Sequence, residues 1–174
     1  TLNTNANFIR STLSVNPHHG AFYLLQKKCD FDPIPWQIVN NANEFVHDLV
    51  LFDCFTILVG LEKNQNPVIL QKWMQNLDKK YVDYAYQSLA QNPTPWAIQK
   101  THAYLDTLDE KERKLFLSKM DGYFLSSNES NEAIALLQAY PQLIYWSALS
   151  RNSNLGALCL LEKNLNKISW SGLS

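Results

Sequence analysis

The stretch AYQSLAQNPTPWAIQ, residues 85–99, carries the pattern that decides the fold: one helix, a short turn and a second helix. Asn92-Pro93 ends the first helix, because a residue that precedes proline avoids helical backbone angles. Thr94 then supplies a hydroxyl cap, and Pro95 suits the first position of the next helix. This stretch therefore predicts a helical hairpin, with helices over 78–91 and 95–106.

Similar signals for helix starts and helix ends occur on both sides of this hairpin. Glycine is scarce, with five residues, and apolar residues recur every three or four positions, which is typical of helices. Asn66-Pro67 and Asn154 mark two further helix starts. The clearest capping box is 107–110, and Gly122 predicts a left-handed stop at the end of the helix that follows it. The other predicted helices span residues 2–13, 21–29, 42–62, 67–76, 108–121, 132–140, 141–150 and 155–165.

These elements predict an all-α protein of about nine short helices, packed as a bundle or as stacked helical hairpins with connections of ordinary length. With 174 residues, 46% of them hydrophobic, the chain suits a single domain with its own core. We expect loosely attached N-terminal helices over 1–30, a core bundle over 33–166 and a tail over 167–174. The helix over 42–62 is predicted to be the most buried. A buried strand over 54–60 is the competing interpretation, but no second β-rich run could pair with it.

Two pairs of segments are alike without forming a regular repeat. PIPWQI (33–38) and PTPWAI (93–98) are 60 residues apart, whereas GLEKNQN (60–66) and LLEKNLN (160–166) are 100 residues apart. Repeat arrays keep one period over several copies. We therefore interpret both Pro-Trp pairs as helix starts that bury a tryptophan, and keep an ancient duplication as the alternative.

Composition argues against several classes of function. The net charge is −1 and the pI about 6.4, so no basic field favours nucleic acid. Phosphate-binding glycine motifs are absent from the sequence, and we expect no cofactor. The apolar run 49–61 is too short to cross a bilayer, and no signal peptide is visible. Cys29, Cys54 and Cys159 form no paired motif, which favours a reducing compartment and hence a cytoplasmic location.

The pair His47-Asp48 is the sharpest candidate for catalysis. Helical phosphohydrolases of the HD superfamily bind a metal through an upstream histidine, an adjacent His-Asp pair and a distal aspartate, and such a metal activates water. The residues that could fill these positions are His18 or His19, then His47 and Asp48, then Asp106, with Asp83 and Asp109 as other distal aspartates. The apolar continuation 49–52 departs from that family. A metal-dependent phosphohydrolase is therefore the alternative hypothesis, and a surface His-Asp pair the preferred one.

Aromatic residues are dense between positions 73 and 104. Exposed Trp and Tyr side chains are common anchors of protein interfaces, although the same residue types also fill helical cores. Tyr84 is predicted to lie off the core face that Tyr81, Ala85 and Leu89 define. The candidate partner-binding residues are Trp73, Tyr84, Tyr86, Trp96, His102 and Tyr104.

Residues 81–156 resemble a family of small, uncharacterised, all-helical bacterial domains. The resemblance lies in AYQSLAQNPTPWAIQ (85–99) and in YPQLIYWSALSRNSNLG (140–156), an aromatic-rich helix followed by a Ser/Asn/Gly turn. It implies an all-α fold. Because that family has no assigned catalytic residues, the resemblance implies no activity.

These features together predict a non-enzymatic protein–protein interaction module. We expect a bacterial adaptor, a chaperone-like protein or an accessory subunit of a larger machine, such as a secretion or envelope system. Its partner would be another protein rather than nucleic acid or a membrane, and a homo-oligomer is compatible with the sequence. A secreted effector or an immunity protein is a further alternative.

Overall fold

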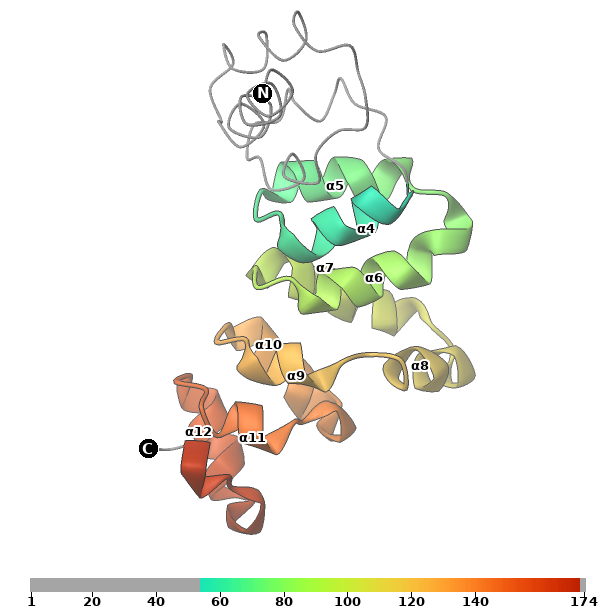
Figure 1. Cartoon of the computed structure of the whole chain (residues 1–174). Coiled ribbons are helices and arrows are strands. Elements are labelled where there is room, and N and C mark those ends of the chain that lie inside the picture. The colour runs from blue at the N-terminus through green and yellow to red at the C-terminus, as the bar shows by residue number, and fades with distance from the viewer. Residues whose placement is uncertain (1–53, 173–174) are drawn as a thin grey trace, which may run out of the picture. The chain divides into compact units, whose positions relative to one another are not determined.

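Every regular element in the described part of the chain is a helix. The computed structural model describes residues 54–172, which contain α-helices and short 3₁₀ helices without a strand (Figure 1). The predicted all-α class is confirmed, and residues 54–60 belong to a helix rather than a strand. The described part divides at Lys79 and Lys80 into two compact units, which we treat separately. The helices predicted over 2–13 and 21–29, and the first part of the one over 42–62, lie outside the described residues.

A helical hairpin of α4 (Cys54–Lys63) and α5 (Pro67–Asn76) lies in the first unit. Asn66 caps α5 by accepting a 2.9 Å hydrogen bond from the Val68 N–H, and Pro67 occupies the first helical position, as predicted. The ring of Trp73 packs on Gly60, where any Cβ would overlap the ring. The missing side chain at Gly60 therefore lets the two helices approach closely.

Three helical hairpins and one additional helix, α8 (Glu110–Leu117), make up the second unit. The first helices of the hairpins are α6 (Val82–Gln91), α9 (Gly122–Ser127) and α11 (Trp146–Leu149). The second helices are α7 (Pro95–Thr107), α10 (Asn131–Ala139) and α12 (Leu155–Glu162). Short 3₁₀ helices cover Lys79–Tyr81, Pro141–Leu143, Leu165–Lys167 and Trp170–Gly172.

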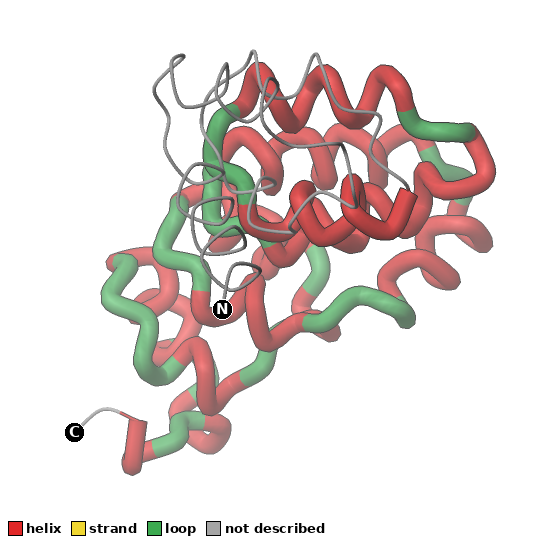
Figure 2. The backbone as a smooth tube through the Cα atoms, turned by 45° about the horizontal axis from the view of Figure 1, so that its top comes forward, coloured by secondary structure: helices red, strands yellow, loops and turns green. Residues whose placement is uncertain are grey.

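The three hairpins stack in two layers. The first helices contact one another in the order α6, α9, α11, and the second helices in the order α7, α10, α12. Figure 2 follows the chain through these helices and the short loops between them. One core cluster contains side chains from both layers, including Ile98, Leu105, Leu125, Leu136, Leu137 and Leu149. Burial of each such side chain contributes about 1.5–3 kcal/mol. Of the two predicted packings, the second unit therefore adopts stacked hairpins.

One type of turn recurs between the two helices of every described hairpin. The Oδ1 atom of an asparagine accepts a hydrogen bond from the N–H two residues later, and that later residue caps the next helix. The asparagines are Asn64, Asn92, Asn128 and Asn152, with N–H···Oδ1 donor–acceptor distances of 2.8, 2.9, 2.9 and 2.9 Å, and the caps are Asn66, Thr94, Ser130 and Asn154. In the second unit these asparagines are 36 and 24 residues apart. A search for one fixed period therefore misses them.

In the second unit the asparagines also join successive turns. Asn128 donates through Nδ2 to the carbonyl of Asn92 at 3.4 Å, and Asn152 donates to the carbonyl of Asn128 at 2.9 Å. Asn92 and Asn152 are buried and Asn128 is half-buried. We call these three residues the asparagine ladder. It satisfies buried polar groups that the turns would otherwise leave unpaired.

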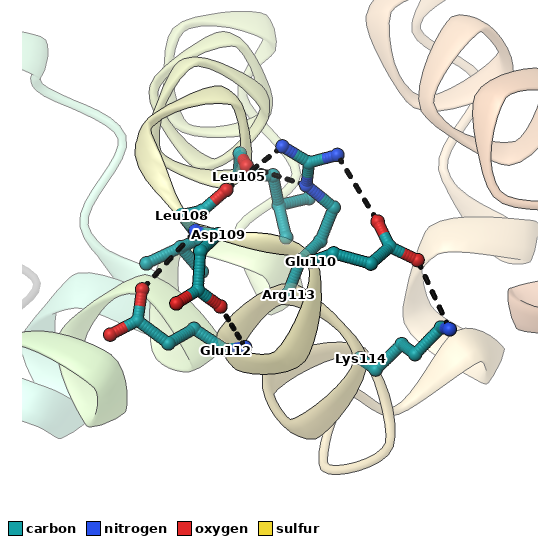
Figure 3. A network of polar contacts seen from close by, with 7 residues as sticks. All are labelled: Leu105, Leu108, Asp109, Glu110, Glu112, Arg113 and Lys114. Atoms are coloured by element: carbon teal, nitrogen blue, oxygen red, sulfur yellow. Dashed lines mark hydrogen bonds and ion pairs between the residues drawn. The ribbon is translucent and has the colours of Figure 1, made fainter.

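The helix α8 is tied to the end of α7 by Arg113 (Figure 3). The guanidinium donates through Nε to the carbonyl of Leu105 and through Nη2 to the carbonyl of Leu108, both at 2.9 Å. The last carbonyls of a helix lack partners within the helix, so Arg113 caps α7 from outside. Glu110 lies 3.8 Å from Arg113 and 3.2 Å from Lys114, in exposed ion pairs that contribute little.

Two predictions around α8 are wrong. The capping box is formed by Asp109 and Glu112 rather than by 107–110, because α7 continues to Thr107. The apolar spacing of the helix predicted over 108–121 places Leu108, Leu115, Phe116 and Met120 in the core. Leu115 is instead exposed, whereas Phe116 and the neighbouring Leu117 are buried. The shifted start of the helix accounts for the first error. Both errors lie where the chain leaves the regular alternation of hairpins.

Gly122 does not end a helix in a left-handed conformation. It is the first residue of α9, Asp121 caps that helix, and no glycine among the described residues has a positive φ. A Cβ at Gly122 would overlap the carbonyl oxygen of Leu143, so this glycine is required by close packing. The helix predicted over 108–121 therefore ends early and a separate α9 follows it. The helix predicted over 141–150 is likewise divided, into a 3₁₀ turn and α11.

Candidate partner-binding surface

Tyr84 is the most exposed of the aromatic residues predicted to bind a partner. Its side chain is 55% exposed on α6, whereas Ala85 and Leu89 of the same helix are fully buried. The prediction that Tyr84 lies off the core face is therefore confirmed. The helical period of 3.6 residues separates these two faces of α6.

Tyr86 and Tyr104 form a stacked pair between α6 and α7. Their ring centroids are 3.9 Å apart and the rings are nearly parallel, at 7°. The Tyr104 hydroxyl donates to Asp83 Oδ1 at 2.5 Å, and its ring meets Phe116 edge-on. Burial, and then the hydrogen bond to Asp83, raise the pKa of Tyr104 above its ordinary value. Burial also raises the pKa of Tyr86, so both hydroxyls stay protonated near neutral pH. The two stacked rings therefore present a half-buried surface between α6 and α7.

The remaining predicted partner-binding residues are dispersed. Trp73 is buried in the first unit and presents almost no surface. Trp96 is half-buried, with the Lys100 Nζ 5.6 Å from its ring centroid. His102 is half-buried and meets Tyr140 edge-on, at 6.3 Å between ring centroids. The structure thus brings only Tyr86 and Tyr104 of the six into direct ring contact among the described residues.

The metal site of the alternative hypothesis falls almost entirely outside the described residues. His18, His19, His47 and Asp48 lie there, and Asp106 is an exposed residue of α7. Between residues 54 and 172, no three His, Cys, Asp or Glu side chains lie close enough together to hold a metal ion. The phosphohydrolase hypothesis stays a prediction.

A second aromatic cluster, absent from the sequence prediction, lies at the start of α9. Tyr123 meets Phe124 edge-on at 5.7 Å and Tyr145 edge-on at 5.5 Å between ring centroids. Tyr123, Phe124 and Tyr145 are 43%, 42% and 52% exposed, respectively. The pair Asp121-Gly122 could have indicated the start of a helix here, because Asp121 accepts a 2.9 Å hydrogen bond from the Tyr123 N–H. We call Tyr123, Phe124 and Tyr145 the α9 aromatic cluster.

A cavity of about 450 Å³ adjoins the α9 aromatic cluster and shares Tyr145 with it. The backbone of Tyr145 is fixed, since its N–H donates to the buried Ser126 hydroxyl oxygen at 2.9 Å. The residues that line the cavity come from α8, the following link and 142–145, and they are Lys114, Leu117, Ser118, Met120, Gly122, Gln142, Leu143, Ile144 and Tyr145. The volume lies within the range of about 300–1,000 Å³ that is common for ligand-binding sites.

Among the described residues, four exposed aromatic residues lie on or next to one helical layer, and a fifth, Trp170, is exposed in the last 3₁₀ helix. Tyr84 lies on α6, Tyr123 and Phe124 lie on α9, and Tyr145 immediately precedes α11. These are the first helices of the three hairpins, which contact one another in series. The layer combines apolar rings with phenolic hydroxyls, a combination suited to the partly wet surface of another protein.

In the part of the chain that the structure describes, no helix has both the length and the apolar character needed to cross a membrane. Comparison of the whole chain with protein-family models, with curated proteins and with solved structures finds no match. The resemblance of residues 81–156 to a bacterial helical family consequently stays a prediction.

Proposed function

We propose that this protein is a non-enzymatic protein–protein interaction module that binds its partner through the first-helix layer of the second unit. The observation that carries the proposal is the set of exposed aromatic side chains Tyr84, Tyr123, Phe124 and Tyr145 on that layer. Tyrosine and tryptophan are enriched among the residues that dominate binding energy at protein interfaces. Stacked hairpins also offer extended surfaces that many repeat-containing proteins use for binding.

A surface of exposed aromatic side chains is compatible with a role in binding other proteins. An adaptor, a chaperone-like protein or an accessory subunit of a bacterial machine needs a recognition surface and no reactive site. The near-neutral net charge of −1 favours a protein partner over nucleic acid. The free, exposed Cys159 fits a reducing compartment, so we place this role in the cytoplasm. Self-association through the same layer is compatible with the proposal.

Site-specific photo-cross-linking tests this function. The photoreactive amino acid p-benzoylphenylalanine would replace Tyr84 or Tyr123 in the cells from which the protein comes. Both positions should yield the same discrete adducts, which peptide identification would assign to a partner. Leu155, on α12 of the other layer, is the control position because it is 78% exposed, more than Tyr84 or Tyr123, so a cross-linker there is at least as accessible to other proteins. Equal adducts at all three positions, or none at Tyr84 and Tyr123, would count against the proposal.

A further inference from the structure

We infer that the cavity beside α8 receives a large apolar side chain of the partner, with a carboxylate of the same partner segment facing Lys114. This inference rests on the proposed function, because it specifies which chemistry the interaction module recognises. The occupant is a short, acidic, aromatic segment of a polypeptide.

Apolar side chains form part of the cavity wall, beside the polar residues Lys114, Ser118 and Gln142. Leu117 and Leu143 are buried, and Met120 and Ile144 are half-buried at the same cavity. These four side chains come from two segments of the chain, α8 with its following link and residues 143–144. An apolar group that enters the cavity loses contact with water on several faces, which favours a large hydrophobic or aromatic side chain.

Lys114 supplies a positive charge at the rim of the cavity. Lys114 is the only charged residue among those that line it, and its side chain is 74% exposed. Its exposed ion pair with Glu110, at 3.2 Å, is weak and can be exchanged for another carboxylate. Charge complementarity at this rim therefore selects an acidic neighbour for the apolar anchor.

The α9 aromatic cluster extends the site beyond the cavity. Tyr145 belongs both to the cluster and to the cavity wall, so a bound segment would pass from one to the other without a break. Tyr123 contacts Tyr145, and Tyr123 and Phe124 add exposed ring surface next to the cavity. A segment with an aromatic anchor in the cavity would thus have both ring surface and the charge of Lys114 within reach.

Methyl NMR titration with defined peptides tests this inference. The probes are acetyl-Asp-Trp-Glu-amide, its charge-reversed form acetyl-Lys-Trp-Lys-amide, its anchorless form acetyl-Asp-Ala-Glu-amide, and free indole. The acidic tryptophan peptide should shift the methyl signals of Leu117, Met120, Leu143 and Ile144 and should bind most tightly. The Lys114→Glu variant should bind it about fivefold more weakly, the size expected for one exposed ion pair, and should prefer the basic peptide.

A control variant tests whether the change in overall charge is enough to weaken peptide binding. Lys163→Glu changes the same charge at an exposed position after α12 and should bind the acidic peptide as the wild type does. Both substituted lysines are exposed, so both variants should keep the wild-type spectrum without peptide. Equal binding of the acidic and basic tryptophan peptides would overturn the inference. Equal binding of the acidic tryptophan peptide and the alanine peptide would also overturn it. So would methyl shifts that occur with indole but with none of the peptides, or no shift of the four methyl signals with any probe.

The outcome is separable from the test of the proposed function. Cross-linking at Tyr84 and Tyr123 without any cavity response to the peptides would reject the acidic, aromatic anchor and leave the interaction module standing. A cavity response without cross-linking from the first-helix layer would reject that layer as the general partner surface.

Discussion

The side-chain amide of Asn152 donates a 2.9 Å hydrogen bond to the main-chain carbonyl of Asn128, 24 residues earlier in the chain. The same Nδ2 group donates to the carbonyl of Ser126 at 2.9 Å, and Oδ1 accepts from the Asn154 N–H at 2.9 Å. Asn152 is only 5% exposed. One buried side chain therefore satisfies backbone groups of two successive turns.

Replacing Asn152 by alanine should lower the free energy of unfolding by about 3 kcal/mol, because buried backbone groups lose their partners. Urea unfolding followed by circular dichroism measures this loss. Asn166→Ala is the control, since Asn166 is exposed, and it should change stability by less than about 0.5 kcal/mol. Similar stability of the two variants would show that the asparagine ladder contributes little.

Replacing Gly122 by alanine should destabilise the protein, although glycine-to-alanine changes within helices usually stabilise by up to about 1 kcal/mol. The new Cβ would overlap the carbonyl oxygen of Leu143, and backbone atoms cannot move aside cheaply. We expect a loss of about 3 kcal/mol in chemical denaturation. Ser127→Ala, at an exposed position of the same helix, should stay close to the wild type. A stabilised Gly122→Ala variant would contradict the observed packing.

Arg113 should matter through the geometry of its guanidinium rather than through its charge. Arg113→Ala removes the donors to the carbonyls of Leu105 and Leu108 and should cost about 2 kcal/mol of stability. Arg113→Lys keeps the charge but lacks the planar fork, so most of the loss should remain. Thermal unfolding compares these variants with Lys111→Ala, an exposed residue of the same helix. Full recovery in the lysine variant would show that charge alone is sufficient.

The raised pKa of Tyr104 makes stability depend on alkaline pH. Above the ordinary tyrosine pKa of about 10, the unfolded chain loses this proton while the folded protein retains it, so stability falls as pH rises. Tyr104→Phe removes the contribution of Tyr104 and leaves that of Tyr86, so the variant should lose less stability than the wild type between pH 8 and pH 11, despite losing the hydrogen bond to Asp83. Denaturant unfolding at several pH values in that range measures how steeply the free energy of unfolding changes with pH. Tyr84→Phe, which removes an exposed hydroxyl, should follow the wild type; identical slopes for all three proteins would contradict the assignment.

The helix starts could be read from the sequence because their signals are local. Asn66, Thr94 and Asn154 each cap a helix as predicted, through a bond to an N–H within the first turn. Tyr84 could likewise be placed on the exposed face of α6 from the helical period alone. Gly122 could not, because the reason for a glycine there is the carbonyl of Leu143, which lies far along the chain.

The α9 aromatic cluster escaped prediction for the same reason. Tyr123 and Tyr145 are 22 residues apart in the chain and meet only because α9 and α11 pack against each other. Interpreting 108–121 as one continuous helix also hid the start of α9 and its exposed rings. The density of aromatic residues between positions 73 and 104 predicted a binding surface there instead. In the structure, Tyr86 and Tyr104 of that segment stack on each other.

The asparagine ladder joins successive turns by the same kind of hydrogen bond, although the length of chain between the turns differs. Asn128 reaches Asn92 across 36 residues and Asn152 reaches Asn128 across 24, yet both joints are the same kind of bond. The longer interval holds α8 as an extra segment, and that segment supplies one wall of the cavity. A scaffold joined in this way can hold an extra helix at one joint while the bond between the turns stays the same. In this protein that extra helix, rather than a turn, supplies Lys114 and Leu117 to the proposed recognition site.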